Sequence, residues 1–142
     1  MKKDDCIFCR IANGDIGSNT VYEDEDFRVI LDLNPGSRGH MLILPKEHAD
    51  DLFELSDDYC EKLMLVARKV ALAAKEALGA QGINLVQNNG EAAGQTVKHF
   101  HMHIIPRYDG DDRGMVNWTP HESDPEAQKQ IEEAIKSELS KM

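Results

Sequence analysis

Apolar residues in the first half of the chain form two short runs on either side of a turn-rich segment. Phe27–Leu31 and His40–Leu44 are rich in aliphatic and aromatic side chains, which is typical of strands. Pro45 ends the second run, because proline cannot donate to a strand ladder. Residues 34–39 between the two runs contain Asn, Pro, Ser and Gly and therefore predict a loop. We expect two antiparallel neighbouring strands joined by this loop.

A longer pattern with a helical period follows between Ser56 and Leu78. Ser56 is a favourable N-cap residue, and Gly79 is favourable just past the last turn. Apolar side chains recur every three or four positions and would share one face of the helix: Tyr59, Leu63, Val66, Val70, Ala74 and Leu78. The pattern predicts the main helix, packed through this face on a sheet. Cys60 lies in the same pattern, and we expect it to be a small buried side chain.

The second half of the chain predicts two more strands. Gly82–Gln87 is expected to be a third central strand, and a loop rich in Asn, Gly and Ala follows it as far as Gln95. The chain then enters a strand that contains the histidine segment His99-Phe100-His101-Met102-His103. Residues 108–114 beyond it are polar and glycine-containing, and they predict a loop.

A last helix is predicted to begin at Pro125, with Asp124 as its N-cap. Its apolar positions Ile131, Ile135 and Leu139 are spaced to share one face, which we expect to be buried. His121 precedes this helix between Pro120 and Glu122 and is expected to be exposed.

Composition narrows the class of protein. With 142 residues and 41% hydrophobic content, the chain suits a single domain over 1–142 that can bury a core. The formal net charge of −10 argues against general binding to nucleic acid or to an anionic membrane, so an anionic substrate would need a local positive pocket. Long apolar runs and a signal-peptide pattern are absent from the sequence, and we expect a cytoplasmic protein.

Two of the three cysteines are spaced as Cys6-x-x-Cys9. Thiols in the cytosol usually stay reduced, so this pair is a candidate for metal binding or redox chemistry rather than for a disulfide. Two thiolates supply only half of a tetrahedral zinc shell, and the spacing is therefore a weak signal by itself.

The histidine segment carries the strongest chemical signal. In a strand, alternate side chains point to opposite faces, so three imidazoles would share one face about 6.6 to 7 Å apart. Such a row can hold a catalytic zinc ion. Alternatively, one neutral imidazole can act as a nucleophile toward phosphorus while its neighbours stabilise charge. The segment alone leaves both possibilities open.

The sequence around these histidines decides between the two possibilities. Residues 88–98, followed by His-Phe-His-Met-His-Ile-Ile, closely resemble the histidine-triad (HIT) superfamily of nucleotide hydrolases and transferases. The resemblance extends upstream through Ile30-Leu31-Asp32 and through Leu44-Pro45-Lys46-Glu47-His48, and it covers about residues 6–107. In its length and N-terminal half the chain resembles small bacterial-type HIT proteins, and residues 108–142 would then be a C-terminal loop and helix.

The resemblance implies a role for each polar residue of the predicted site. His101 would be the nucleophile, oriented by a backbone carbonyl, with His103 and His40 beside the phosphate. Asn88, Gln95 and Thr96 would be polar residues on the phosphate side, and Asp32 would bind the ribose hydroxyls. An apolar base pocket would include the following residues, each of which could equally be plain core: Ile7, Phe8, Ile11, Ile30 and Leu33.

The resemblance also implies a structural zinc site. Some members of the superfamily bind zinc through a Cys-x-x-Cys pair, a histidine after the Pro-Lys segment and the first histidine of the triad. The corresponding residues here are Cys6, Cys9, His48 and His99. A closed shell of four protein ligands is typical of structural zinc. The alternative is a pair of reduced, metal-free thiols.

The implied fold is α+β, with a five-stranded, mainly antiparallel sheet, one long helix across a face and a C-terminal helix. The implied protein is a homodimeric hydrolase of purine nucleotides that forms a nucleotidyl-histidine intermediate and needs no metal for catalysis. It would cleave dinucleoside polyphosphates or nucleoside phosphoramidates and release a nucleoside monophosphate. Residues 94–99 and Pro106-Arg107 resemble the dinucleoside polyphosphate branch more closely.

Two other functions stay open. One is a zinc-dependent hydrolase in which the three histidines hold the metal, and the other is a non-catalytic nucleotide-binding regulatory protein.

Overall fold

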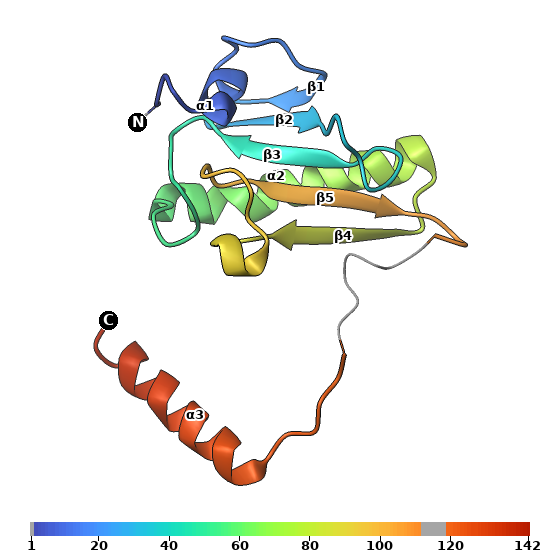
Figure 1. Cartoon of the computed structure of the whole chain (residues 1–142). Coiled ribbons are helices and arrows are strands. Elements are labelled where there is room, and N and C mark those ends of the chain that lie inside the picture. Colours follow the sequence, from blue (N-terminus) through green and yellow to red (C-terminus); the bar gives the residue numbers. More distant parts are fainter. Residues whose placement is uncertain (1, 112–118) are drawn as a thin grey trace. The chain divides into compact units, whose positions relative to one another are not determined.

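The computed structural model describes residues 2–111 and 119–142, which belong to two compact units that divide after Asp111. In the first unit, five strands form one sheet in the order β1-β2-β3-β5-β4, and every neighbouring pair is antiparallel (Figure 1). The strands are β1 (Thr20–Glu23), β2 (Phe27–Leu31), β3 (Met41–Pro45), β4 (Gly82–Gln87) and β5 (Met102–Arg107). The predicted α+β class and five-stranded antiparallel sheet are confirmed.

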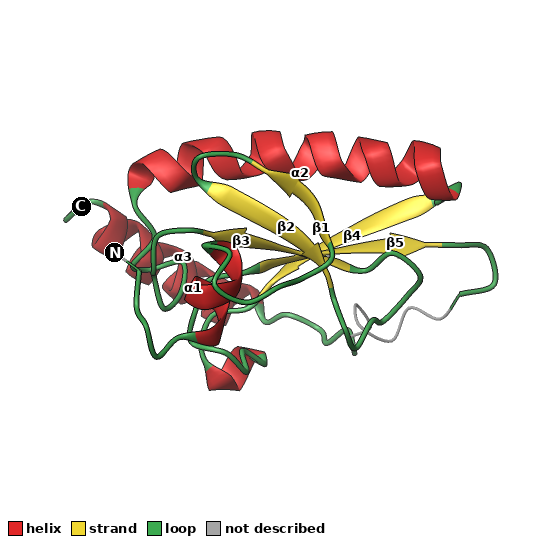
Figure 2. Cartoon of the chain, turned by 90° about the horizontal axis from the view of Figure 1, so that it is seen from above, coloured by secondary structure: helices red, strands yellow, loops and turns green. Residues whose placement is uncertain are grey.

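The long helix α2 (Asp57–Leu78) covers one face of this sheet (Figure 2). The Ser56 side chain accepts a hydrogen bond from the Tyr59 N–H, and Gly79 ends the helix in the left-handed conformation, as the sequence predicted. Tyr59, Leu63 and Val66 are buried among core residues from the facing strands. Cys60, in contrast, is exposed rather than buried. It follows Tyr59 by one position, which turns its side chain about 100° away from the buried face.

The short helix α1 (Ile7–Ala12) packs against β2 and β3 on the other face of the sheet, where Ala12 joins a second apolar cluster with Ile30, Leu42 and Leu44. Leu42 lies opposite His103 in the register of β3 and β5. Because side chains directly opposite in a sheet share a face, His103 points to the side of α1 and not to the side of α2. The side of the sheet that carries α1 therefore carries the site.

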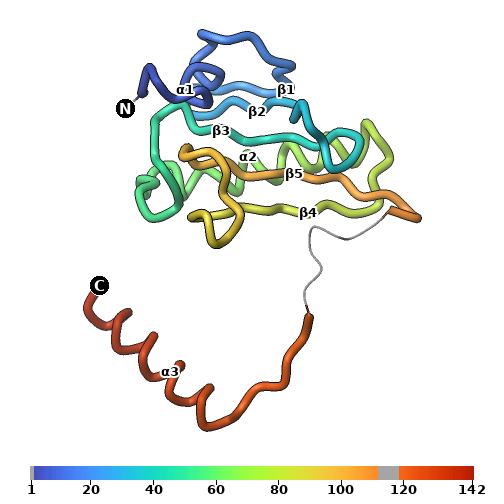
Figure 3. The backbone as a smooth tube through the Cα atoms, in the orientation of Figure 1, coloured from blue at the N-terminus to red at the C-terminus, as the bar shows by residue number. Residues whose placement is uncertain are grey.

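The last strand of the sheet in sequence, β5, lies between β3 and β4 (Figure 3). The bounds predicted for Gly82–Gln87 are confirmed, but this strand is an edge strand and not a central one, because β5 inserts on its inner side. The histidine strand also begins later than predicted, at Met102. Before it, the Phe100 N–H donates to the Ala49 carbonyl in a loop, so this backbone bond lies outside the strand ladder.

The second unit contains the helix α3 (Pro125–Leu139), and the Asp124 side chain accepts from the Glu126 N–H, as expected for its N-cap. The predicted burial of its apolar face is wrong. The side chains of Ile131, Ile135 and Leu139 are 53%, 57% and 61% exposed, because residues 119–142, the part of this unit that the structure describes, form one helix with short flanks and no facing element. His121 is exposed, as expected. The predicted loop 108–114 extends past Asp111, outside the described residues.

Among the described residues, no helix has the combined length and apolar character that a membrane crossing requires.

Candidate functional site

His101 lies in the segment that leads into β5, and only 6% of its surface is exposed. Its Nδ1–H donates to the His99 carbonyl oxygen, 2.7 Å away, so in the neutral ring the lone pair is on Nε2. The Phe8 ring stands edge-on to the imidazole, with 5.1 Å between ring centroids. Burial lowers the pKa of His101 below its ordinary value, which favours the neutral ring near pH 7. The structure therefore presents Nε2 of His101 as an available nucleophile.

His40 and His103 form a hydrogen-bonded chain beside His101. The Gly36 N–H donates to Nδ1 of His40 over 2.8 Å, so neutral His40 carries its proton on Nε2. That proton points at Nδ1 of His103, 2.9 Å away, which leaves the His103 proton on its own Nε2. His103 thereby becomes a donor toward the cavity that it lines. Burial, with smaller effects of the nearby His101 and His40, lowers the pKa of His103 to about 4.

Asp32 follows β2 and lies against the same pair of histidines. One carboxylate oxygen accepts the Asn34 N–H at 2.8 Å, and the other is 3.6 Å from Nε2 of His40. Its negative charge partly offsets the effect of burial, which lowers the pKa of His40. This places a half-buried acceptor at the rim of the histidine cluster.

His101, His103 and Asp32 line a cavity of about 400 Å³, a volume that suits a small ligand, whereas His40 lies behind His103 and does not line it. All five apolar residues predicted for the base pocket line it, together with Asp32, Thr96, His101 and His103: Ile7, Phe8, Ile11, Ile30 and Leu33. Their exposure differs, because Ile30 is 6% exposed and also packs in the core, whereas Leu33 is 85% exposed. Leu33 is therefore not core, and the apolar wall is available to a flat ring.

Two predicted phosphate-side residues, Asn88 and Gln95, are not among the residues that line this cavity. The buried Gln95 amide instead donates to the Asp50 and Val97 carbonyls and accepts the Gly90 N–H. Gln95 therefore holds the loop that presents Thr96 and is not an open binding group. Asn88 lies at the end of β4, where its amide nitrogen is close to Gly94 in the same loop.

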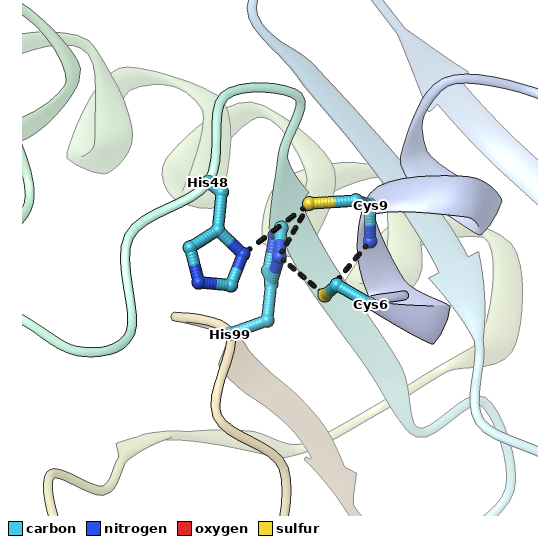
Figure 4. Close-up of side chains that lie close together, drawn as sticks. All are labelled: Cys6, Cys9, His48 and His99. Carbon is cyan, nitrogen blue, oxygen red and sulfur yellow. Dashed lines mark hydrogen bonds between the residues drawn. The ribbon is translucent and has the colours of Figure 1, made fainter. Parts of the chain in front are cut away.

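A second cluster joins the N-terminal segment to the histidine segment. The ligand atoms of Cys6, Cys9, His48 and His99 all lie within 4.8 Å of one another (Figure 4). Nδ1 of His99 is 3.3 Å from the Cys6 sulfur, and Nδ1 of His48 is 3.3 Å from the Cys9 sulfur. Tetrahedral zinc separates sulfur and nitrogen ligands by about 3.5 Å, so these spacings suit that ion.

The Nε2 atom of each imidazole in this cluster has a partner that would orient the ring for metal binding. Nε2 of His48 is 2.7 Å from the Asp50 carboxylate, and Nε2 of His99 is 2.9 Å from the Pro45 carbonyl. These partners keep the ring protons on Nε2 and direct both Nδ1 lone pairs at the thiols, which is the usual support of metal-bound histidine. Burial lowers the pKa of His99 to about 4, which keeps the ring neutral.

The same geometry disfavours a metal held by His99, His101 and His103 together. Both ring nitrogens of His99 are directed elsewhere, to the Pro45 carbonyl and to the thiols. Nδ1 of His101 is bonded to a carbonyl. His99 is therefore directed away from the cavity that His101 and His103 share.

Several residues of the site were not predicted. Gly36 acts through its backbone N–H, which carries no side-chain signal in a sequence. Leu31, Asn34, Leu42 and Val97 also line the cavity. Asp50 lies two positions after His48, and a carboxylate next to a metal-ligand histidine would have been the signal for its supporting role.

Comparisons with known proteins agree with these observations. The family model described as "HIT domain" matches residues 13–110. The chain is similar to "Protein hit" of Bacillus subtilis, with 41% identity and 96% of each chain covered. It is also similar to "Adenosine 5'-monophosphoramidase hnt1" of Schizosaccharomyces pombe, with 39% identity over 94% of this chain and 98% of the relative.

Solved structures extend the similarity to the fold. A crystal structure from Streptococcus mutans has a TM-score of 0.91 at 39% identity and covers 96% of this chain and 87% of that chain. A zinc-bound histidine triad family protein from Mycobacterium smegmatis has a TM-score of 0.73 at 36% identity, over 97% of this chain and 98% of that chain. The chain is therefore a small member of the HIT domain family.

Proposed function

We propose that this protein hydrolyses a nucleotide phosphate bond through a covalent nucleotidyl-histidine intermediate on His101. The observation that carries the proposal is the bond from Nδ1–H of His101 to the His99 carbonyl, which leaves Nε2 unprotonated beside the cavity. A phosphate there would be close to the His103 donor, and a nucleoside would have Asp32 and an apolar wall beside it.

In the first step, Nε2 of His101 attacks the α-phosphorus of the bound nucleotide. A P–Nε2 bond forms and the bond to the leaving group breaks, with its electron pair departing on the leaving amine or phosphate, which takes a proton from water. The positive charge on the ring is stabilised by the His99 carbonyl that accepts Nδ1–H. The Nε2–H of His103 stabilises the negative phosphoryl oxygens. These residues thus position and stabilise the reacting groups.

In the second step, a water molecule attacks the phosphorus and loses a proton to solvent. The P–Nε2 bond breaks, its electron pair returns to the His101 ring, and a nucleoside monophosphate is released. The same residues act in both steps, and the cysteine-containing cluster takes part in neither.

We propose a purine nucleoside phosphoramidate as the first substrate to test, and a dinucleoside polyphosphate as the second. The description of the S. pombe relative as an adenosine 5′-monophosphoramidase supports the first. The second is supported by the sequence of residues 94–99, which resembles the polyphosphate branch of the superfamily. Both substrates place a nucleoside monophosphate in the cavity and differ only in the group that departs.

We also propose that Cys6, Cys9, His48 and His99 bind a structural zinc ion. The spacing of their ligand atoms and the partners of both imidazoles support this. The ion would connect the N-terminal segment to the segment that carries His101, with no open coordination position for substrate.

A homodimer is the proposed assembly. The edge strand β4 and the helix α2 carry exposed apolar side chains, with Leu65, Leu72 and Leu85 60%, 55% and 41% exposed. Pairing of two such surfaces would remove this apolar area from water and extend the sheet. Light scattering during gel filtration should give twice the chain mass, and Leu72→Glu should shift it toward the monomer.

The experiment that tests the function is incubation with adenosine 5′-phosphoramidate, followed by measurement of adenosine monophosphate. We expect turnover by the unaltered protein and a loss of at least about a thousandfold in His101→Ala. His121→Ala is the matched control, because His121 is an exposed histidine outside the site. Nucleotide binding without turnover in the unaltered protein would instead favour a regulatory role.

A further inference from the structure

A second cavity adjoins the one that holds the proposed nucleotide. Its volume is about 470 Å³, and Ile7, Thr96 and Val97 line both cavities. Lys3 and Lys98 line only the second cavity. The loop residues Thr96 and Val97 therefore form a common wall between a space with His101 and a space with two lysines.

The two lysines are free to meet a ligand. Neither ammonium group has a hydrogen bond or ion pair within residues 2–111 and 119–142. Both lysines line the same cavity as Asp50. Two lysines whose ammonium groups lack a partner among the described residues therefore belong to the lining of one cavity.

The charges of this cavity differ from those of the chain as a whole. The chain carries a net charge of −10, so an anionic group approaching most of its surface is repelled. Here, one acidic lining residue, Asp50, is already bonded to the His48 ring at 2.7 Å. The lining contains two lysines, Lys3 and Lys98, and two aspartates, Asp5 and Asp50, so its formal charges balance. This balanced lining repels an anionic group less than the acidic surface of the chain does, and its two ammonium groups, unpartnered within the described residues, can donate hydrogen bonds to such a group.

The position of the cavity says which part of a substrate would enter it. The nucleoside occupies the first cavity along its apolar wall, and His101 attacks the phosphorus there. In such a displacement the departing group lies away from the nucleophile, roughly in line with the bond that forms. It must leave the first cavity past one of its walls, and Thr96 and Val97 form the wall that continues into the second cavity.

We propose that the second cavity is the leaving-group subsite, and that Lys3 and Lys98 select leaving groups that carry a negative charge of their own. The inference rests on the proposed hydrolysis and makes it more specific. The preferred substrates are nucleoside monophosphates joined to a carboxylate-bearing amine or to a phosphate chain. In either case the recognised group is an anion located beyond the bond that breaks.

A pair of substrates with equal size and different charge tests this selection. The pair is adenosine 5′-phosphoramidate made with β-alanine, which has a free carboxylate, and with β-alaninamide, which has a neutral amide. We expect the ratio of kcat/KM for the acid to that for the amide to fall about tenfold in Lys98→Gln, because a charge-assisted hydrogen bond is lost. Lys3→Gln should lower the same ratio, and Lys98→Arg should retain it.

The controls separate this inference from the proposed function. Lys75→Gln changes an exposed lysine at the end of α2 and should leave the ratio as in the unaltered protein. Salt of about 1 M should reduce the preference for the acid, because exposed charges are screened. Diadenosine tetraphosphate distinguishes the source of the anion. If Lys98→Gln lowers kcat/KM for this substrate alone, the recognised group is a phosphate chain. If it lowers kcat/KM for the β-alanine compound, the recognised group is a carboxylate.

An unchanged ratio in Lys98→Gln, Lys3→Gln and the double variant, with both phosphoramidates cleaved, would overturn the inference and leave the hydrolase intact. If the unaltered protein cleaves none of the three substrates, the proposed function itself fails, and the selection fails with it.

Discussion

Nε2 of His40 lies 2.9 Å from Nδ1 of His103, while the Gly36 N–H occupies the other ring nitrogen of His40. The Gly36 N–H therefore determines which nitrogen of His103 carries the proton. It acts through the His40 ring, which lies between the two groups. The consequence is that His103 can donate from Nε2 into the cavity without first becoming charged.

The first prediction concerns this chain of three groups. His40→Ala should lower kcat by about tenfold to a hundredfold with a smaller change in KM, because His103 loses the partner that fixes its tautomer. Nitrogen NMR of the histidine rings should show His103 protonated on Nε2 in the unaltered protein. A mixture of both tautomers in the unaltered protein, or an equal loss in His121→Ala, would contradict this account.

Protonation of His103 should couple to stability. Its pKa is about 4 in the folded protein and near 6.5 in an unfolded chain. The unfolded state therefore binds more protons than the folded state between these two pH values. The contribution of neutral His103 to stability is complete above about pH 6.5 and is lost as the pH falls toward 4. Urea unfolding at pH 7 and pH 5 should show lower stability at pH 5, and His103→Gln should reduce the difference. An unchanged difference in that variant would assign the pH effect to other groups.

Metal analysis tests the cysteine-containing cluster. The unaltered protein should contain about one zinc ion per chain, and Cys6→Ser/Cys9→Ser should contain almost none. Loss of a structural ion of this kind should also lower Tm by roughly 10 °C. Cys60→Ser is the control, because Cys60 is exposed and lies outside the cluster. Equal zinc in the double variant and the control would refute the ligand set.

The packing around the histidine segment should contribute to the stability of the fold. Phe100, which lies between His99 and His101 in the sequence, is fully buried, whereas Phe53 is 83% exposed. Phe100→Ala should cost about 3–5 kcal/mol of unfolding free energy, because it leaves a cavity in the core. Phe53→Ala should change stability by less than about 0.5 kcal/mol. Similar losses in chemical denaturation would contradict the described core.

The main helix could be predicted in detail from its sequence, whereas the C-terminal helix could be predicted only in part. Both have a recognisable N-cap and a helical apolar period, which are local signals. Burial is not local, because it depends on whether another element covers the face. Tyr59 and Leu63 pack against the sheet, whereas Ile131 and Ile135 stay exposed in the described part of their own unit, residues 119–142.

The order of the strands also depends on contacts between distant segments. The limits of Gly82–Gln87 follow from local composition, but its place at the edge follows from β5 pairing with both β3 and β4. The short strand β1 and the helix α1 were not predicted. Thr20–Glu23 has little apolar pattern, and its burial is slight.

The site also has features that local sequence predicts and features that only the folded chain determines. Alternation in the histidine segment predicted that its imidazoles share a side, and the resemblance to HIT proteins supplied the partners His40 and His48. Gln95 was expected at the phosphate, but its amide binds three backbone groups instead. A side-chain amide suits either use equally well, and only the folded loop determines which partners it reaches.

Trapping the covalent intermediate tests the central claim most directly. The protein is mixed briefly with adenosine 5′-phosphoramidate, denatured in alkali, where a phosphorus–nitrogen bond to histidine survives, and analysed by mass spectrometry of its peptides. We predict one adenylyl group on the peptide that contains His101, present in His121→Ala and absent in His101→Ala. An adenylyl group that persists in His101→Ala, or turnover by the unaltered protein with no attached nucleotide at any time, would contradict nucleophilic attack by His101.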